Sequence, residues 1–141
     1  MSRIFWDTNL FIYLLEDYGR FSQQVVVLLK KMAERGDELL TSTLTVGEIT
    51  AKPLSHGDTD RCQRYEEAIQ SNAVVLPFDL PAARQFAKLR ATHQSIRPPD
   101  AIQLACAATI GTDLFLTNDS RLHNLRVDGI QFITSVDRAP I

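Results

Sequence analysis

Four acidic residues fall at points where a folded chain could bring them together. Asp7 directly follows one short apolar segment and Asp119 closely follows another, while Glu48 and Asp100 lie in helix-like segments next to such runs. No histidine or cysteine shares a ligand spacing with them. Ligand sets made only of oxygen suit Mg²⁺ or Mn²⁺. A bound divalent ion activates water and offsets charge on phosphoryl oxygens, so the chemistry to consider is metal-assisted hydrolysis of a phosphate ester.

Alternating strands and helices must position these acids. Apolar segments bounded by turn residues predict strands at residues 3–6, 38–42, 73–76, 114–117 and 130–134. Helical periodicity and end signals predict helices at residues 10–15, 20–36, 43–52, 58–72, 79–94, 100–110 and 119–125, with Pro53 ending the third. Near-continuously apolar strands are typical of parallel sheets covered on both faces. The predicted fold class is α/β: a three-layer α/β/α sandwich with a mainly parallel sheet of about five strands, in a single domain spanning residues 1–141.

The topology of such a sheet brings the acids to one edge. Right-handed crossovers place the carboxyl ends of parallel strands on the same side, and ligands bind beyond that edge. Asp7, Glu48 and Asp119 follow strands, and Asp100 begins a helix that runs antiparallel to them, so all four are expected there. Asp113 precedes its strand and is expected at the opposite edge, about 15–20 Å away at roughly 3.3 Å per residue.

Each acid also has a simpler explanation. Asp7, Asp100 and Asp119 could cap helices or complement a helix dipole, and Glu48 could be an ordinary exposed helix residue. Together, however, four converging carboxylates would repel one another and raise their pKa values, which favours a bound cation. Other reactive side chains fit surface or structural roles, with Cys106 buried on a helix; they are His56, His93, His123, Cys62 and Cys106.

Four short segments resemble the acidic motifs of the PIN-domain nucleases. They are Asp7-Thr8-Asn9, Val46-Gly47-Glu48-Ile49, Pro99–Ala105 and Leu116–Asp119, in the family's order over essentially the whole chain. The chain length is similar to that of the VapC-type toxins of bacterial and archaeal toxin–antitoxin pairs. One departure is Leu122, where many relatives carry an aromatic residue.

The resemblance implies a metal-dependent endoribonuclease. Its Mg²⁺ or Mn²⁺ would be held by Asp7, Asp100 and Asp119, with Glu48 binding directly or through water. Neighbouring side chains that would orient the ligands or the substrate are Thr8, Asn9, Thr117 and Asn118. Basic residues near the acids could contact RNA phosphates, or could equally be ordinary surface charge; they are Lys52, Arg97 and Arg121.

The resemblance also implies protein partners. Relatives form homodimers and bind an antitoxin segment, and exposed apolar patches mark such interaction sites. The first two predicted helices carry more apolar residues than one sheet face requires, among them Phe11, Tyr13, Leu14 and residues 25–29. We therefore expect a homodimer and a cognate antitoxin.

The overall charge is compatible with an RNA partner once the four acids are set aside. The formal net charge is −2, but the other 13 acids are outnumbered by 15 lysines and arginines. The N-terminus lacks the features of an export signal, and no apolar run approaches the roughly 18 residues of a membrane helix. The sequence therefore predicts a cytoplasmic protein with no membrane segment.

Two other functional classes are alternatives. A receiver-type signalling domain also has a parallel sheet and an acidic Mg²⁺ pocket, but it needs an acid pair at the first strand and a lysine after the last. Asp7 has no acidic neighbour, and no lysine follows Lys88. A catalytically inactive PIN-like scaffold that binds RNA or protein is the second alternative. All four acids are present, so the sequence gives the scaffold no support.

Overall fold

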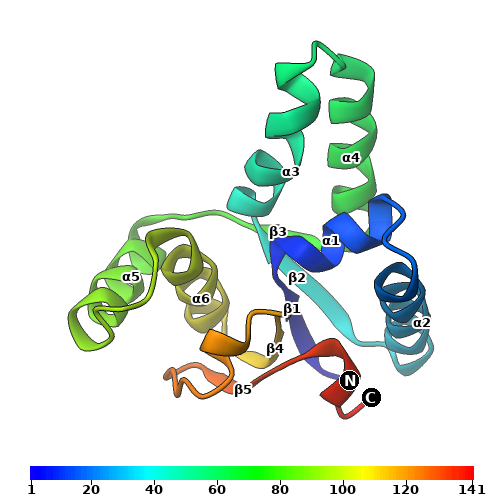
Figure 1. Cartoon of the computed structure of the whole chain (residues 1–141). Helices are drawn as coiled ribbons and strands as arrows, with labels where there is room; N and C mark the ends of the chain where they lie inside the picture. The colour runs from blue at the N-terminus through cyan, green and yellow to red at the C-terminus, as the bar shows by residue number, and fades with distance from the viewer.

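The three central strands of the sheet are buried almost completely. The computed structural model describes residues 1–141, and its strands are β1 (Arg3–Trp6), β2 (Glu38–Ser42), β3 (Val74–Leu76), β4 (Thr112–Leu116) and β5 (Ile130–Thr134). Neighbouring strands are all parallel and follow the order β3-β2-β1-β4-β5, with β1 in the middle (Figure 1). The predicted parallel sheet of five strands is confirmed.

Helices cover both faces of this sheet, because alternate strand residues point to opposite sides. Phe5, Leu40 and Phe115 form one core under α5 (Leu80–Thr92) and α6 (Pro98–Ile110). The Phe5 and Phe115 rings stack there with their centroids 5.0 Å apart. Ile4 and Trp6 belong to the other core. The helices that contribute residues to that core are α1 (Thr8–Leu15), α2 (Arg20–Arg35), α3 (Thr43–Ser55) and α4 (Thr59–Asn72).

Figure 1 shows how these layers are arranged. The pair α5 and α6 lies on one side of the sheet, α1 and α2 lie on the other, and α3 and α4 stand together as a hairpin above the strand ends. The predicted three-layer α/β/α sandwich is confirmed. The acidic residues near the strand ends thus have helices from both layers around them.

Local capping explains where several helices begin and end. Asp7, Asp58 and Asp79 each accept a hydrogen bond from a backbone N–H of the first turn that follows, at 2.8, 3.1 and 3.1 Å. An aspartate at this position satisfies an N–H group that has no partner within the helix. The helix α2 stops at Gly36, whose φ of 74° is the left-handed conformation that glycine adopts at low cost.

The prediction that Pro53 ends the third helix is wrong. The helix α3 continues through Pro53 to Ser55. Pro53 has no N–H to donate, but it lies near the end of the helix and its carbonyl accepts bonds from the N–H groups of His56 and Asp58 at 3.1 and 2.9 Å. Its side chain is also buried, so packing and these carbonyl contacts outweigh the missing bond.

Two other boundaries differ from the predictions near the acids. The helix α6 begins at Pro98, because two prolines fit a first turn whose N–H groups have no helical partner. The segment after Asp119 is a short 3-10 turn, Ser120–Leu122, and not a helix to residue 125. The backbone hydrogen bonds of this turn join residues three positions apart. His123 Nε2 lies 2.8 Å from the Thr117 carbonyl oxygen, and this contact keeps the turn close to the end of β4.

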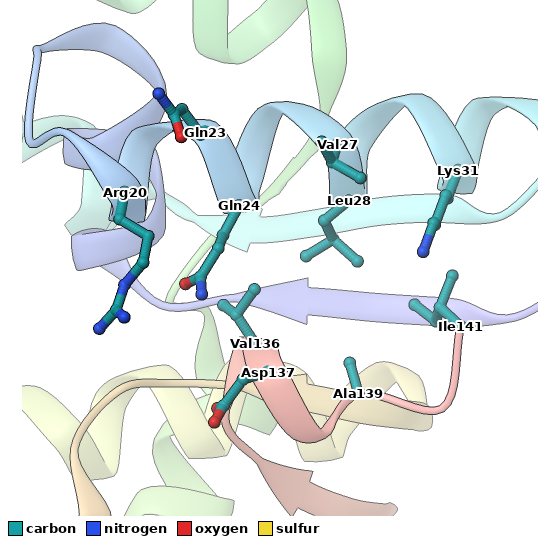
Figure 2. Close-up of a pocket in the computed structure, with 10 residues that line it drawn as sticks. All are labelled: Arg20, Gln23, Gln24, Val27, Leu28, Lys31, Val136, Asp137, Ala139 and Ile141. Atoms are coloured by element: carbon teal, nitrogen blue, oxygen red, sulfur yellow. The ribbon is translucent and has the colours of Figure 1, made fainter.

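The C-terminal segment returns to α2. Val136, Ala139 and Ile141 lie along this helix and form a cavity with Val27, Leu28 and polar α2 side chains (Figure 2). None of the acids singled out in the sequence lines it. No helix in the structure is both long enough and apolar enough to cross a membrane.

Candidate active site

Asp7 stands where the central strand gives way to α1. Its backbone N–H bonds the carbonyl of Leu116 on β4 at 3.0 Å, which fixes it at the carboxyl edge of the sheet. Its Oδ1 accepts from the N–H of Thr8 and its Oδ2 from the hydroxyl of Thr117, both at 2.8 Å. Burial raises the pKa of Asp7 despite these hydrogen bonds, and the charges of Asp100 and Glu48 add smaller upward contributions.

Asp119 follows β4 and is held beside Asp7 by one hydroxyl. The Thr117 Oγ1 that donates to Asp7 also accepts from the backbone N–H of Asp119 at 3.1 Å. Arg121 reaches back to Asp119 with Nε 2.9 Å from Oδ1 and Nη2 2.6 Å from Oδ2. This two-point contact lowers the pKa of Asp119, so the carboxylate is held in its ionised form.

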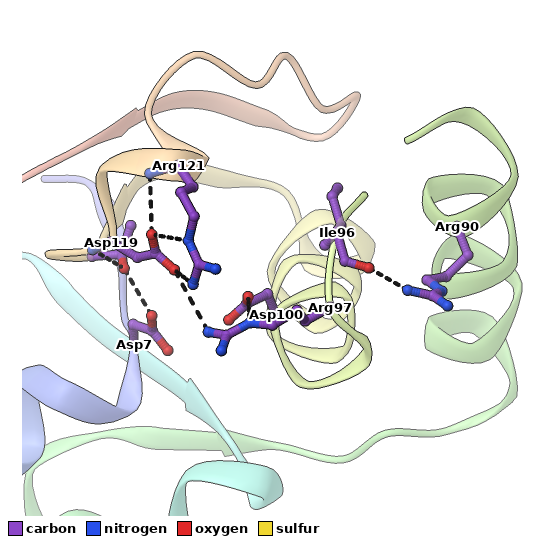
Figure 3. A network of polar contacts seen from close by, with 8 residues as sticks. Asp7, Arg90, Ile96, Arg97, Asp100, Asp119 and Arg121 are labelled. Carbon is purple, nitrogen blue, oxygen red and sulfur yellow. Dashed lines mark hydrogen bonds and ion pairs between the residues drawn. The ribbon is translucent and has the colours of Figure 1, made fainter. Parts of the chain in front are cut away.

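Glu48 and Asp100 approach from two helices. Glu48, on α3, accepts a hydrogen bond from the Thr8 hydroxyl at 2.6 Å. Asp100 lies in the first turn of α6, and Arg97 Nε is 3.2 Å from its Oδ2. Nη2 of the same arginine is 3.8 Å from Asp119 Oδ2. Figure 3 shows Arg97 joined to both aspartates by these contacts.

All four acids line one cavity of about 220 Å³ beyond the strand ends. Its complete lining is Asp7, Thr8, Asn9, Ile12, Glu48, Pro99, Asp100, Gln103 and Asp119. Asp113, in contrast, accepts a bond from the backbone N–H of Arg3 at 2.8 Å, at the start of β1. The predicted convergence of the four acids, and the exclusion of Asp113, agree with this arrangement.

The donor set of this cavity suits a hard divalent cation, because it offers carboxylate and hydroxyl oxygens with no sulfur or imidazole. The carboxylates are not gathered tightly around one point: no group of three or more acidic, histidine or cysteine side chains is close enough to share an ion. Instead, arginines supply positive charge to Asp100 and Asp119 (Figure 3). The expectation that mutual repulsion raises the pKa values of the four acids is therefore wrong for Asp119, whose pKa is lowered. The pKa of Asp7 is raised, but mainly by burial.

The family model described as PIN domain matches residues 4–128 of the chain. The chain belongs to the PIN domain family. The match confirms the resemblance seen in the acidic motifs, and it gives no support to the receiver-type alternative. The comparison with curated proteins finds no match.

Several solved structures share the fold of this PIN domain. VapBC2 from Rickettsia felis, bound to a promoter DNA fragment, superposes with a TM-score of 0.76 at 13% identity, covering 94% of this chain and 98% of that one. VapBC from Salmonella typhimurium, bound to DNA, gives 0.73 at 21% identity, covering 96% and 99%. FitAcB from Neisseria gonorrhoeae gives 0.66 at 25% identity, covering 83% and 88%.

The remaining predicted site residues differ in how close they lie to the PIN-domain acids. Thr8 and Thr117 hydrogen-bond carboxylates directly, and Asn9 lines the cavity. Asn118 is half-buried but does not line it, and Lys52 is exposed on α3 outside the lining. The two predicted phosphate-binding arginines, Arg97 and Arg121, contact acids of the site.

Sequence reasoning missed Gln103. This side chain lines the cavity, yet only 2% of the residue is exposed. Its neighbours on α6, Ala101, Leu104 and Ala105, are fully buried. The sequence signal that could have identified Gln103 is a glutamine within an apolar helical stretch, because a buried amide needs hydrogen-bond partners. Leu122, where relatives often have an aromatic residue, is buried in the core beside α5 and α6.

Proposed function

We propose that this PIN domain is a metal-dependent endoribonuclease that hydrolyses phosphodiester bonds in RNA and acts as the toxin of a toxin–antitoxin pair. The observation that carries the proposal is the meeting of four carboxylates, from four different segments of the chain, in one polar cavity beyond the strand ends. Parallel α/β sheets bind their ligands at this edge.

A divalent ion would be held by Asp7, Asp100 and Asp119, with Glu48 binding directly or through water. Because the carboxylates do not yet share one point, this requires Arg97 and Arg121 to turn away from Asp100 and Asp119 so that the acids can draw together. When bound, Mg²⁺ or Mn²⁺ supplies an activated water and neutralises charge on the phosphate. The hydroxyl of Thr117 fixes Asp7, and that of Thr8 fixes Glu48.

Arg97 and Arg121 have a second role in this proposal. Both side chains are 61% exposed, so they can turn toward solvent without leaving a packed core. If Asp100 and Asp119 instead held a metal ion, Arg97 and Arg121 would be free beside the cavity. There the two guanidinium groups, with Lys52 further along α3, can contact RNA phosphates.

An antitoxin partner is supported by the structures that share the fold, since they include a member of the VapBC family of toxin–antitoxin systems from Mycobacterium tuberculosis. On α2, Val26 and Val27 are 53% and 52% exposed, which leaves apolar surface for a partner segment. Other apolar residues expected to form such a surface are buried in the core, namely Phe11, Val25 and Leu28. We also propose a homodimer; a monomer in sedimentation at tens of micromolar, roughly the range of a weak interface, would contradict it.

Cleavage of a 5′-labelled RNA mixture tests the enzymatic proposal. Wild-type protein should cut the RNA with Mg²⁺ or Mn²⁺, and Asp7→Asn and Asp119→Asn should lose the activity by about 100-fold or more because the amide cannot replace the charged ligand. Asp113→Asn is the matched control, since it lies at the other end of the sheet. An inactive wild type would favour the alternative of a scaffold that only binds RNA or protein, and full activity in Asp7→Asn would contradict the site.

A further inference from the structure

A buried polar network lies directly beneath the candidate metal site. Gln103 is its centre and is only 2% exposed. Its amide nitrogen donates to the hydroxyls of Thr8 at 3.0 Å and Thr45 at 2.8 Å. Its amide oxygen accepts from the Ser42 hydroxyl. Every hydrogen-bonding atom of this side chain is therefore satisfied inside the protein.

The direction of these hydrogen bonds follows from Glu48. The Thr8 hydroxyl donates its single proton to Glu48 Oε1 at 2.6 Å, where the carboxylate oxygen accepts. That hydroxyl has no second proton to offer Gln103 and must accept instead. The amide of Gln103 is thereby fixed with its nitrogen toward Thr8 and its oxygen toward Ser42, which agrees with the contacts in the structure.

The same network joins the segments that carry three of the acids. Thr45 lies on α3, one helical turn before Glu48. Its hydroxyl is 2.8 Å from that of Thr41 on β2. Thr41 in turn donates to the carbonyl of Trp6, the residue before Asp7, at 3.0 Å. Gln103 itself lies one helical turn after Asp100 on α6. Fully satisfied buried networks of this kind make the relative position of their elements rigid.

We propose that Gln103 is a positioning residue of the metal site: it orders the Thr8 hydroxyl toward Glu48 and holds α6, with Asp100, against the segments that carry Asp7 and Glu48. The inference rests on the proposed metal-dependent function. Groups that orient metal ligands through hydrogen bonds typically change metal affinity by 10- to 100-fold when they are removed. Gln103 acts through Thr8, so loss of either side chain should remove the same contribution.

A double-mutant cycle on Mn²⁺ affinity, measured by isothermal titration calorimetry, tests this proposal. Gln103→Met keeps the length of the side chain and Thr8→Val its shape, but both remove the hydrogen bonds. Each should weaken Mn²⁺ binding about tenfold or more, and the double variant should be little weaker than either single one. Gln70→Met, at an exposed position on α4, is the control and should bind Mn²⁺ as the wild type does.

Several outcomes would overturn the proposal, and they can be told apart. Unchanged affinity in Gln103→Met, or single losses that simply add in the double variant, overturns the role of Gln103 alone. Wild-type protein that shows no Mn²⁺ binding dependent on Asp7 overturns the proposed function and this inference with it. Thermal melts in chelator report whether each variant folds. If Gln103→Met does not fold, Thr8→Ser should retain the affinity that Thr8→Val loses, and equal affinity in both overturns the network.

Discussion

Binding of a divalent metal should stabilise this fold, and Asp7 should be the residue most responsible. Asp100 and Asp119 have arginine partners, whereas Asp7 is half-buried and has none. Burial raises the pKa of Asp7 above the ordinary value of 3.8. The ionised form therefore costs folding free energy at pH 7 in the absence of metal. This cost is absent below pH 3.8 and fully present above the raised folded pKa.

The substitution Asp7→Asn separates the effect of charge from the effect of shape. The amide oxygen can still accept from the Thr8 N–H, so the cap of α1 is kept. In chelator at pH 7 the variant should be at least as stable as the wild type, and its advantage should shrink as the pH falls toward the ordinary aspartate pKa. A metal present at a hundred times its Kd stabilises the wild type by about 2.7 kcal/mol. For a chain of this length that raises the Tm by roughly 8–13 °C.

Thermal melts followed by circular dichroism provide the assay, with chelator and with Mn²⁺ at a hundred times the Kd found by calorimetry. Asp7→Asn should gain less than about 3 °C from the metal, because it has lost a charged ligand. Asp113→Asn should gain as much as the wild type. The reasoning would be refuted if Asp7→Asn were much less stable in chelator and still responded fully to Mn²⁺. Asp7 would then be a structural cap only.

Three further predictions concern a glycine beside α6, an arginine of the site and the two cysteines. Gly129→Ala should lower the free energy of unfolding in denaturant titrations by about 2–4 kcal/mol, because φ is +95° and an added Cβ would meet the backbone of α6. Gly111→Ala is the control: its φ is +81°, but the space around it is open, so it should lower the free energy of unfolding by less. Arg121→Gln should tighten Mn²⁺ binding roughly two- to fivefold in calorimetry, since exposed ion pairs compete only weakly with a metal; weaker binding would contradict that competition. Burial raises the pKa of the Cys106 thiol to about 11. At pH 8 a thiol reagent should therefore label Cys62 first and Cys106 only after unfolding. Equal labelling rates of the two cysteines in the folded protein would contradict this order.

The sequence was informative wherever a local pattern determined the geometry. The abrupt change from an apolar strand to Asp7 placed this residue at the sheet edge. The helix before β4 runs antiparallel to the strands, and this direction placed Asp100, at its start, at the same edge. Both inferences need only strand direction and connection handedness. The Pro53 boundary failed because a local proline rule was outweighed by packing and by contacts made by the proline carbonyl.

What the sequence could not give depends on contacts between distant segments. The hydrogen bonds of Gln103 join residues up to 95 positions apart, and no periodicity reports them. Arg97 and Arg121 were recognised as basic residues near the acids, but the direction of a long side chain is not encoded in its spacing. The apolar residues Phe11 and Val25 were assigned to a partner surface, whereas both are buried in the core beneath α1 and α2.

The central claim is that the carboxylate cavity holds a divalent ion that is needed for RNA cleavage. The most direct test measures single-turnover cleavage of a labelled RNA across a titration of Mn²⁺ in metal-free buffer, next to the calorimetric binding curve. We predict that the rate is negligible in chelator and rises with a midpoint equal to the Kd, and that Asp119→Asn shifts or abolishes both curves together. RNA cleavage that continues at the full rate in excess chelator, with wild-type protein freed of contaminating nuclease, would contradict the account.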